Sequence, residues 1–122
     1  MVLIQILYNM VAYLMIKKIR LLLEYGTYPI WLYNENDEII DNIPPPEWEN
    51  DKELDELTTK LIDNYEKGFI NTPKIFEYIG FKSEKEKSTI RALADKVAKL
   101  VEQKNNGKYI IVNDFQQDLD CL

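Results

Sequence analysis

The sequence predicts an α+β fold, in which an antiparallel or mixed sheet of four to five strands carries two main helices packed on one face. Three observations lead to this class. Apolar and polar side chains alternate from Lys18 onward, which is typical of a half-buried strand. Two later stretches repeat apolar residues every three or four positions, which is typical of helices. The length of 122 residues suits one domain with its own core.

The first sixteen residues carry no charge and are almost wholly apolar, and Lys17 follows them. A secretory signal places its positive charge before the apolar stretch, so this order argues against one. A membrane-spanning helix needs about 20 apolar residues, so an anchor is also disfavoured and we expect a cytoplasmic protein. Residues 1–14 then either cover apolar surface of the domain or take part in a homodimer through residues 1–16. The remaining alternative is a protein that begins at Met15.

The first strand begins at Lys18, and a hairpin over residues 30–41 follows it. Residues 30–33 are rich in side chains that favour strands, and residues 38–41 return as a short third strand. The intervening residues 34–37 read Asn-Glu-Asn-Asp, and such side chains favour a turn because they bond to their own backbone.

Three prolines at residues 44–46 end this part of the sheet, because proline donates no backbone hydrogen bond. The first main helix comes next. Its predicted N-cap is Asn50, which forms a capping box with Glu53, and Gly68 occupies the predicted C′ position. The residues expected to point inward are Leu54, Leu57, Leu61, Ile62 and Tyr65.

Residues 74–81 are apolar on both faces, which predicts a strand in the centre of the sheet. Ser83 and Glu86 form the capping box of the second main helix, which ends at residues 105–107, Asn-Asn-Gly. Residues 109–112 form the last strand. The residues of the second helix expected to point inward are Ile90, Leu93, Val97, Leu100 and Val101.

The chain contains no linker long enough to separate two domains. We therefore expect an apolar N-terminal segment over residues 1–14 and a single α+β domain over residues 15–114. Residues 115–122 show little periodicity and are expected to be a loose tail.

The composition excludes most classes of enzyme. Without histidine, neither a Ser-His-Asp nor a Cys-His arrangement can form. A single cysteine, Cys121, excludes an internal disulfide and a four-cysteine zinc site. Four scattered glycines build no phosphate-binding loop. We therefore predict a protein that is not an enzyme, with no catalytic residue, no cofactor and no metal, and its net charge of −6 argues against direct nucleic-acid binding.

Acidic residues are concentrated in the segment 34–66, which we call the acidic segment. It holds twelve acidic residues against two lysines, a net charge of −10, whereas the whole chain carries −6. Such asymmetry attracts a basic protein partner, and Trp48 is of the type that anchors interfaces. The other interpretation is that the acidity serves solubility and Trp48 folds back over the first helix. The predicted partner-binding residues are Glu35, Asp37, Glu38, Glu47, Trp48, Glu49, Asp51 and Asp55.

Four stretches carry a resemblance to known proteins: IRLLLEYGTYPIWLYNENDEIIDN, PPPEWENDKELDEL, EYIGFKSEKEK and GKYIIVND. Over roughly residues 15–114, the chain resembles small acidic proteins encoded in low-GC Gram-positive bacteria. Some of these resemble immunity proteins of polymorphic or contact-dependent toxin systems. The resemblance implies a protein that binds a cognate toxin and blocks it.

The leading hypothesis is thus an inhibitor or immunity protein that presents its acidic segment to a basic partner such as a nuclease toxin. A phage or mobile-element protein that mimics DNA, of the anti-CRISPR or anti-restriction type, is the alternative within the same class. Two alternatives come from different classes: a metal hydrolase built from carboxylates alone, and a structural protein that associates with itself through residues 1–16.

Overall fold

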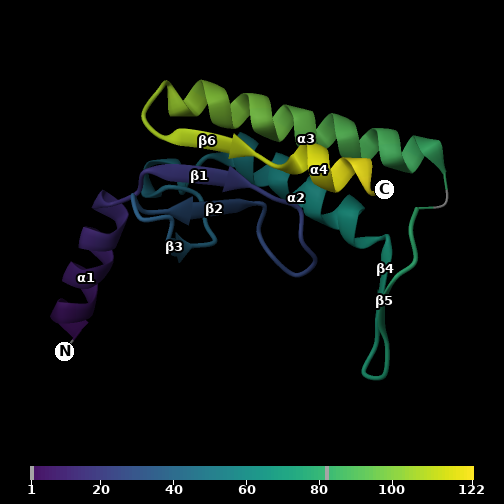
Figure 1. The fold of residues 1–122 in the computed structure, drawn as a ribbon, viewed down its shortest axis with the longest axis horizontal. Coiled ribbons are helices and arrows are strands. Elements are labelled where there is room, and N and C mark those ends of the chain that lie inside the picture. Colours follow the sequence, from purple (N-terminus) through teal and green to yellow (C-terminus); the bar gives the residue numbers. More distant parts are fainter. Residues whose placement is uncertain (1, 82) are drawn as a thin grey trace.

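The computed structural model describes residues 2–81 and 83–122, without the side chains of Tyr8 and Asn9, so Met1 of the expected apolar segment lies outside it. In chain order the elements are α1 (Val2–Leu14), β1 (Lys18–Leu21), β2 (Ile30–Tyr33), β3 (Ile39–Asp41), the 3-10 helix η1 (Pro46–Trp48), α2 (Lys52–Glu66), β4 (Phe69–Asn71), β5 (Phe76–Tyr78), α3 (Glu84–Asn105), β6 (Ile110–Asn113) and α4 (Phe115–Asp120). The expected α+β class is confirmed, with a mixed four-stranded sheet in the order β3-β2-β1-β6 and a separate two-stranded sheet (Figure 1).

The main sheet buries one face. β1 pairs antiparallel with β2 and parallel with β6, so the last strand returns beside the first. The predicted hairpin over residues 30–41 is present, and Asp37 takes a positive φ of 60° in its turn. On the buried face, alternate residues of the two central strands are fully shielded from solvent; they are Ile19, Leu21, Ile30 and Leu32.

α2 and α3 pack against each other and share the core with the buried face of the sheet. The predicted capping of α3 is confirmed, because the Ser83 hydroxyl oxygen accepts from the Glu86 backbone N–H at 3.2 Å. Its end is also as expected, with Asn106 in the left-handed conformation at a φ of 46°. The residues of these helices that contribute the most buried side chains are Leu54, Leu61, Ile90, Val97 and Val101.

The predicted N-cap of α2 needs correction, whereas Gly68 holds the predicted C′ position after the C-cap Lys67. Asp51, and not Asn50, is the N-cap, and its carboxylate accepts from the Leu54 backbone N–H at 2.8 Å. Gly68 follows a C-cap at Lys67 that remains right-handed. Gly68 does not adopt a positive φ, so no left-handed cap forms there; a Cβ atom on it would lie 2.6 Å from the Phe81 ring, and the glycine allows that ring to approach closely.

The prediction of a central strand over residues 74–81 is wrong. Within the described residues β5 pairs with β4 alone, in a hairpin that projects from the body, and all three β5 residues are exposed (Figure 1). The apolar character on both faces has a different cause, because the rings of Phe69 and Phe76 stack 5.8 Å apart and Tyr25 packs against both. Aromatic contacts within the hairpin thus take the place of burial in the main sheet.

Residues 115–122 are not the loose tail that we expected. Phe115 and Leu119, four positions apart, are buried on one side of α4 and belong to the main core. The Asn113 side chain accepts from the Phe115 backbone N–H at 3.0 Å, and Asp118 accepts from the Leu23 backbone N–H at 2.8 Å. Two apolar residues at helical spacing are enough to dock this short helix.

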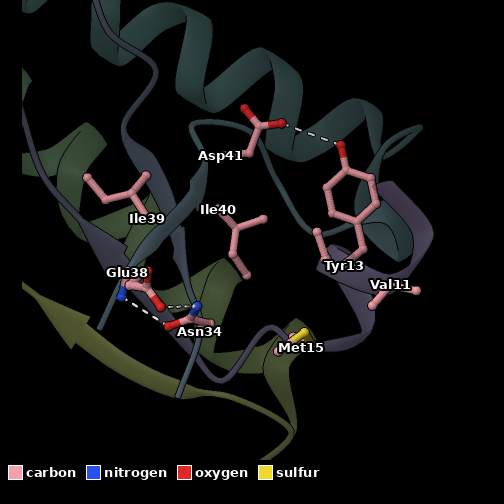
Figure 2. A pocket seen from close by; sticks show the side chains of 9 residues that line it. Val11, Tyr13, Met15, Asn34, Glu38, Ile39, Ile40 and Asp41 are labelled. Atoms are coloured by element: carbon pink, nitrogen blue, oxygen red, sulfur yellow. Dashed lines mark hydrogen bonds between the residues drawn. The ribbon is translucent and has the colours of Figure 1, made fainter. Parts of the chain in front are cut away.

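α1 extends away from the body instead of covering it (Figure 1). Its link to the sheet is at its last turn, where the Tyr13 hydroxyl donates to the Asp41 carboxylate at 3.4 Å (Figure 2). A groove of about 380 Å³ lies between that turn and the edge strand β3. Among the described residues, no helix combines the length and the apolar character that crossing a bilayer requires.

Candidate functional site

The eight residues predicted to bind a partner lie in three places along the acidic segment. Glu35, Asp37 and Glu38 belong to the turn between β2 and β3. Glu47, Trp48 and Glu49 belong to η1 and its end. Asp51 and Asp55 lie at the start of α2, as its N-cap and in its first turn.

Trp48 is a core residue, which corrects its expected place on a binding surface. Its side chain is 7% exposed and belongs to the main hydrophobic cluster. Its ring meets that of Tyr109 edge to face, with the centroids 6.3 Å apart. A buried ring in this position stabilises the fold and offers no area to a partner, so the other interpretation of Trp48, as a residue folded inward, agrees better with the structure.

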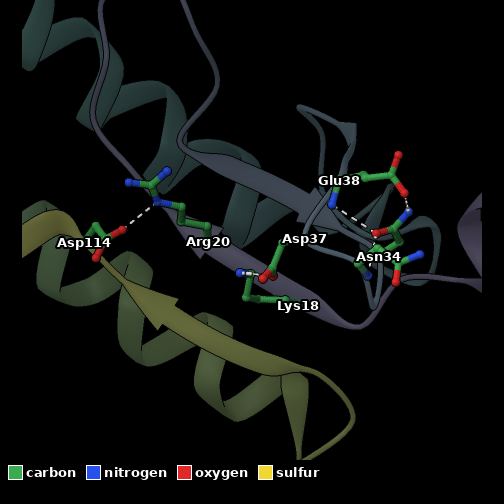
Figure 3. A network of polar contacts seen from close by, with 7 residues as sticks. Lys18, Arg20, Asn34, Asp37, Glu38 and Asp114 are labelled. Carbon is green, nitrogen blue, oxygen red and sulfur yellow. Dashed lines mark hydrogen bonds and ion pairs between the residues drawn. The ribbon is translucent and has the colours of Figure 1, made fainter.

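Three of the predicted carboxylates are engaged by lysines from outside the acidic segment. The Lys18 ammonium lies 2.6 Å from the Asp37 carboxylate on the sheet face opposite the helices (Figure 3). Lys104 forms an ion pair with Asp51, which is already the N-cap of α2. These carboxylates hold elements of the fold together.

Glu47 is engaged most closely. It accepts from the Tyr109 hydroxyl at 2.5 Å and from the Lys108 ammonium at 2.9 Å. Burial raises the pKa of Glu47, but the hydrogen bonds from Tyr109 and Lys108 outweigh it, so the net shift is downward. Glu47 therefore stays ionised and joins η1 to the residues before β6.

At the turn, Glu38 and Glu35 are both exposed. The Glu38 carboxylate accepts from the Asn34 side chain at 3.2 Å. Glu35 lies beside the end of α1, where it lines a shallow depression with Leu14 and Met15. These two carboxylates give the turn its negative charge.

Glu49 and Asp55 remain at the rim of a depression of about 330 Å³ that we call the tyrosine–proline depression. Its lining residues are Tyr13, Tyr28, Ile43, Pro44, Pro46, Glu49 and Asp55. Both carboxylates belong to exposed residues, and neither forms an ion pair with any residue of the ranges 2–81 and 83–122. An apolar and aromatic floor is thus edged by two acidic groups that are available for binding.

Hydrogen bonds hold both tyrosines of the depression in place. Asn42 fixes the backbone of Tyr28, because its side chain accepts from the Tyr28 N–H at 3.0 Å and donates to the Tyr28 carbonyl at 2.6 Å. The Tyr28 hydroxyl lies 3.3 Å from the hydroxyl of Thr58, which is buried in α2. Tyr13 is oriented by its bond to Asp41. Both rings are therefore placed before any ligand arrives.

The electrostatics of the depression favour a cation. Burial raises the pKa of Tyr28, and the nearby Asp55 carboxylate adds to the effect. Burial likewise raises the pKa of Tyr13, with Asp41 and Glu49 acting in the same direction. Neutral phenols among carboxylates suit a guanidinium or ammonium group, whose alkyl stem can lie on aromatic and proline surface.

Glu49 and Asp55 were predicted from the sequence, but the floor between them was not. Tyr13 falls in the expected apolar N-terminal segment, and the prolines were expected only to end the first part of the sheet. Nothing in the sequence spacing connects these residues, because the sheet and α1 bring them together only in three dimensions.

The described part of the chain contains no group of three or more acidic or cysteine side chains arranged to hold a metal ion. No protein-family model, no curated protein and no solved structure matches the chain. The tyrosine–proline depression and the charge around it are the features of this fold that bear on function.

Proposed function

We propose that this chain is a non-enzymatic inhibitor of the immunity type, which binds a basic protein such as a nuclease toxin through its acidic segment. The observation that carries the proposal is the pair of exposed carboxylates, Glu49 and Asp55, on the rim of the tyrosine–proline depression. Both residues are exposed, neither forms an ion pair within the described residues, and both border aromatic and apolar side chains.

The depression is of a size and chemistry to receive one arginine or lysine side chain of the partner. The cationic head would lie between Glu49 and Asp55, and its alkyl stem would lie against Tyr28 and the prolines. Close charge pairs across a protein interface contribute about 1.5–7 kcal/mol when solvent is excluded. Pairs left at an exposed rim contribute about 0–1 kcal/mol, so burial of the cationic head decides the affinity.

The wider acidic segment would guide the partner to this point. Lys18, Lys104 and Lys108 compensate three of its carboxylates, which leaves the rest of its negative charge uncompensated. A field of one sign speeds the encounter of oppositely charged proteins, and salt weakens it. In such a complex, carboxylates would occupy the positions where a nuclease binds substrate phosphates, and inhibition would follow from occlusion.

The test begins with affinity capture of partners from the native host, followed by binding measurements on the purified partner. The double variant Glu49→Lys and Asp55→Lys should weaken binding at least about tenfold, because it reverses both rim charges. The matched control is Glu53→Lys with Glu56→Lys, which changes the net charge equally at exposed positions of α2 outside the depression. The control should reduce the association rate only modestly.

Equal binding by the rim variant and the wild type would overturn the proposal. Equal weakening by both double variants would show that net charge alone attracts the partner. If the captured protein is a defence nuclease and DNA competes for the same site, the DNA-mimic alternative replaces the immunity function.

A further inference from the structure

α1 exposes almost all of its apolar side chains. Across its described residues, the large apolar side chains are between 49% and 84% exposed. They are Val2, Leu3, Ile4, Ile6, Leu7, Met10, Val11 and Leu14. An apolar helix that is exposed to water tends to associate with other apolar surfaces, and the described residues of one copy of the chain do not bury this one.

Helical geometry arranges part of this surface as a seam. Leu3, Leu7, Met10 and Leu14 follow one another at spacings of four, three and four, which is the repeat of a coiled coil. Ile4, Ile6 and Val11 flank the seam on both sides, whereas Gln5 lies on the opposite face of the helix. This pattern is typical of a helix that pairs with another helix of the same kind.

We propose that α1 pairs with α1 of a second copy of this chain, in antiparallel orientation, through the seam formed by Leu3, Leu7, Met10 and Leu14. Antiparallel pairing places Leu3 against Leu14 of the second copy and Leu7 against Met10 of the second copy. Every residue of the seam then has an apolar counterpart. This pairing is independent of the proposed inhibitor function.

Charge sets the orientation. The end of α1 lies beside the turn that carries Glu35 and Glu38, because Met15 lines grooves with both residues (Figure 2). A parallel pair would bring two such turns together, and each keeps a net charge of −1 when Glu35, Asp37 and Glu38 are set against the neighbouring Lys17 and Lys18. In an antiparallel pair, the turns lie at opposite ends of helices about 20 Å long, beyond the Debye length of about 8 Å at physiological salt.

The same acidic turn argues for a second copy rather than a lipid surface. At the end of α1, the exposed Lys17 shares a depression with Glu35, and Glu38 lies in the adjoining groove, so this end of the helix has no net positive charge to draw it to an anionic bilayer. Helices that lie on bilayers characteristically have a charged face rich in lysine or arginine, whereas residues 2–16 contain no charged side chain. A second uncharged helix meets neither difficulty.

Much apolar surface is available for such a pairing. The seven side chains of the seam and its flanks are each between 49% and 84% exposed, and burial of apolar surface contributes about 25 cal/mol per Å². Pairing would also stabilise α1 itself, because isolated helices of about 12–15 residues are only marginally stable in water. The hydrogen bond to Asp41 supports its last turn alone.

Cysteine cross-linking in the full chain tests both the pairing and its direction. In a Cys121→Ser background, Leu3→Cys and Leu14→Cys are mixed, one of them labelled with nitrogen-15, and are treated with oxidised glutathione. We expect the mixed disulfide between the two variants to dominate. Gln5→Cys is the control on the opposite face and should not cross-link with either. Disulfides that join Leu3→Cys chains only to each other would overturn the antiparallel arrangement.

Sedimentation of uncross-linked protein provides the second arm. The wild type should form a concentration-dependent dimer, and Leu7→Glu should raise its dissociation constant by about 100-fold or more, because two seam positions per dimer become charged. Gln5→Glu, with the same added charge, should dimerise like the wild type. A wild type that is monomeric at all concentrations, or that floats with phosphatidylcholine vesicles as a monomer, would overturn the proposal.

Discussion

The Asp118 carboxylate of α4 accepts a hydrogen bond that helps to hold the fold together, although its surroundings disfavour its negative charge. Its oxygen accepts from the Leu23 backbone N–H at 2.8 Å, which joins α4 to the residues after β1. Burial raises the pKa of Asp118, and this outweighs the opposite effect of the Leu23 hydrogen bond. The negative charges of Asp114 and Glu24 raise it further. The native state therefore binds a proton here more readily than the unfolded chain does.

Asp118→Asn should consequently raise the thermal stability at neutral pH. An amide oxygen can still accept from Leu23, and the disfavoured charge is removed. The penalty in the wild type is fully present above the raised native pKa and disappears as the pH falls to the ordinary aspartate value of about 3.9. Thermal melts between pH 7 and pH 3 should thus show a gain in Tm that shrinks toward acid.

Asp120→Asn, an exposed change of equal charge on the same helix, is the control for net charge. A gain of the same size in both variants, or a gain at Asp118 that grows toward acid, would contradict the explanation.

At the scale of elements, the start of α2 depends on one side chain. Asp51 accepts from the Leu54 N–H and also pairs with Lys104 of α3, so it caps one helix and ties it to the other. Losing a capping side chain costs about 0.5–2 kcal/mol. Asp51→Ala should lower the free energy of unfolding by that amount, whereas Asn50→Ala should leave it almost unchanged.

Urea denaturation of the two variants measures this difference directly. If Asn50→Ala is the costlier change, the capping box predicted from the sequence operates in solution and the observed cap does not.

Elements that depend on local residues were predictable from the sequence. Ser83 capping α3, Asn106 ending it and the turn at residues 34–37 all involve contacts between near neighbours in the chain. The strand over residues 74–81 was predicted in the centre of the main sheet, but it belongs to a separate hairpin. Its alternating pattern shows that both faces are apolar, but it does not show which residues cover those faces. The residues that cover it include Tyr25, some fifty positions earlier in the chain.

The candidate site likewise contains residues that the sequence could predict and residues that it could not. Charge alone identified Glu49 and Asp55, because acidic clustering is visible in the sequence. Trp48 was misassigned, since an exposed anchor and a buried core residue look alike in a sequence, and its burial depends on contacts with Tyr109. Tyr13 was not predictable, because it joins the site only through the position of α1 against β3.

At the scale of the whole molecule, two surfaces occupy different parts of the fold. The seam runs along α1, whereas the tyrosine–proline depression lies where the end of α1 meets the residues around η1 and the start of α2. Tyr13 is the residue of α1 that lines the depression, and it is next in sequence to Leu14 of the seam. Dimerisation and partner binding should therefore be separable, apart from the contribution of this one ring.

A chain that lacks residues 1–14 should keep the fold and lose the dimer. Its core is intact, because the buried cluster begins at Ile16 and ends at Leu119. We expect cooperative unfolding with Tm lowered by no more than about 5 °C, which corresponds to roughly 1 kcal/mol for the loss of half-buried Tyr13. We also expect a monomer at every concentration, and weaker binding of a basic partner because one wall of the depression is missing. Calorimetry and light scattering check the first two outcomes.

Tyr13→Phe in the full chain is the matched control, since it removes only the hydroxyl bond to Asp41 and should keep the dimer. An unfolded truncated chain would show that α1 belongs to the core, and a truncated dimer would move the self-association surface elsewhere.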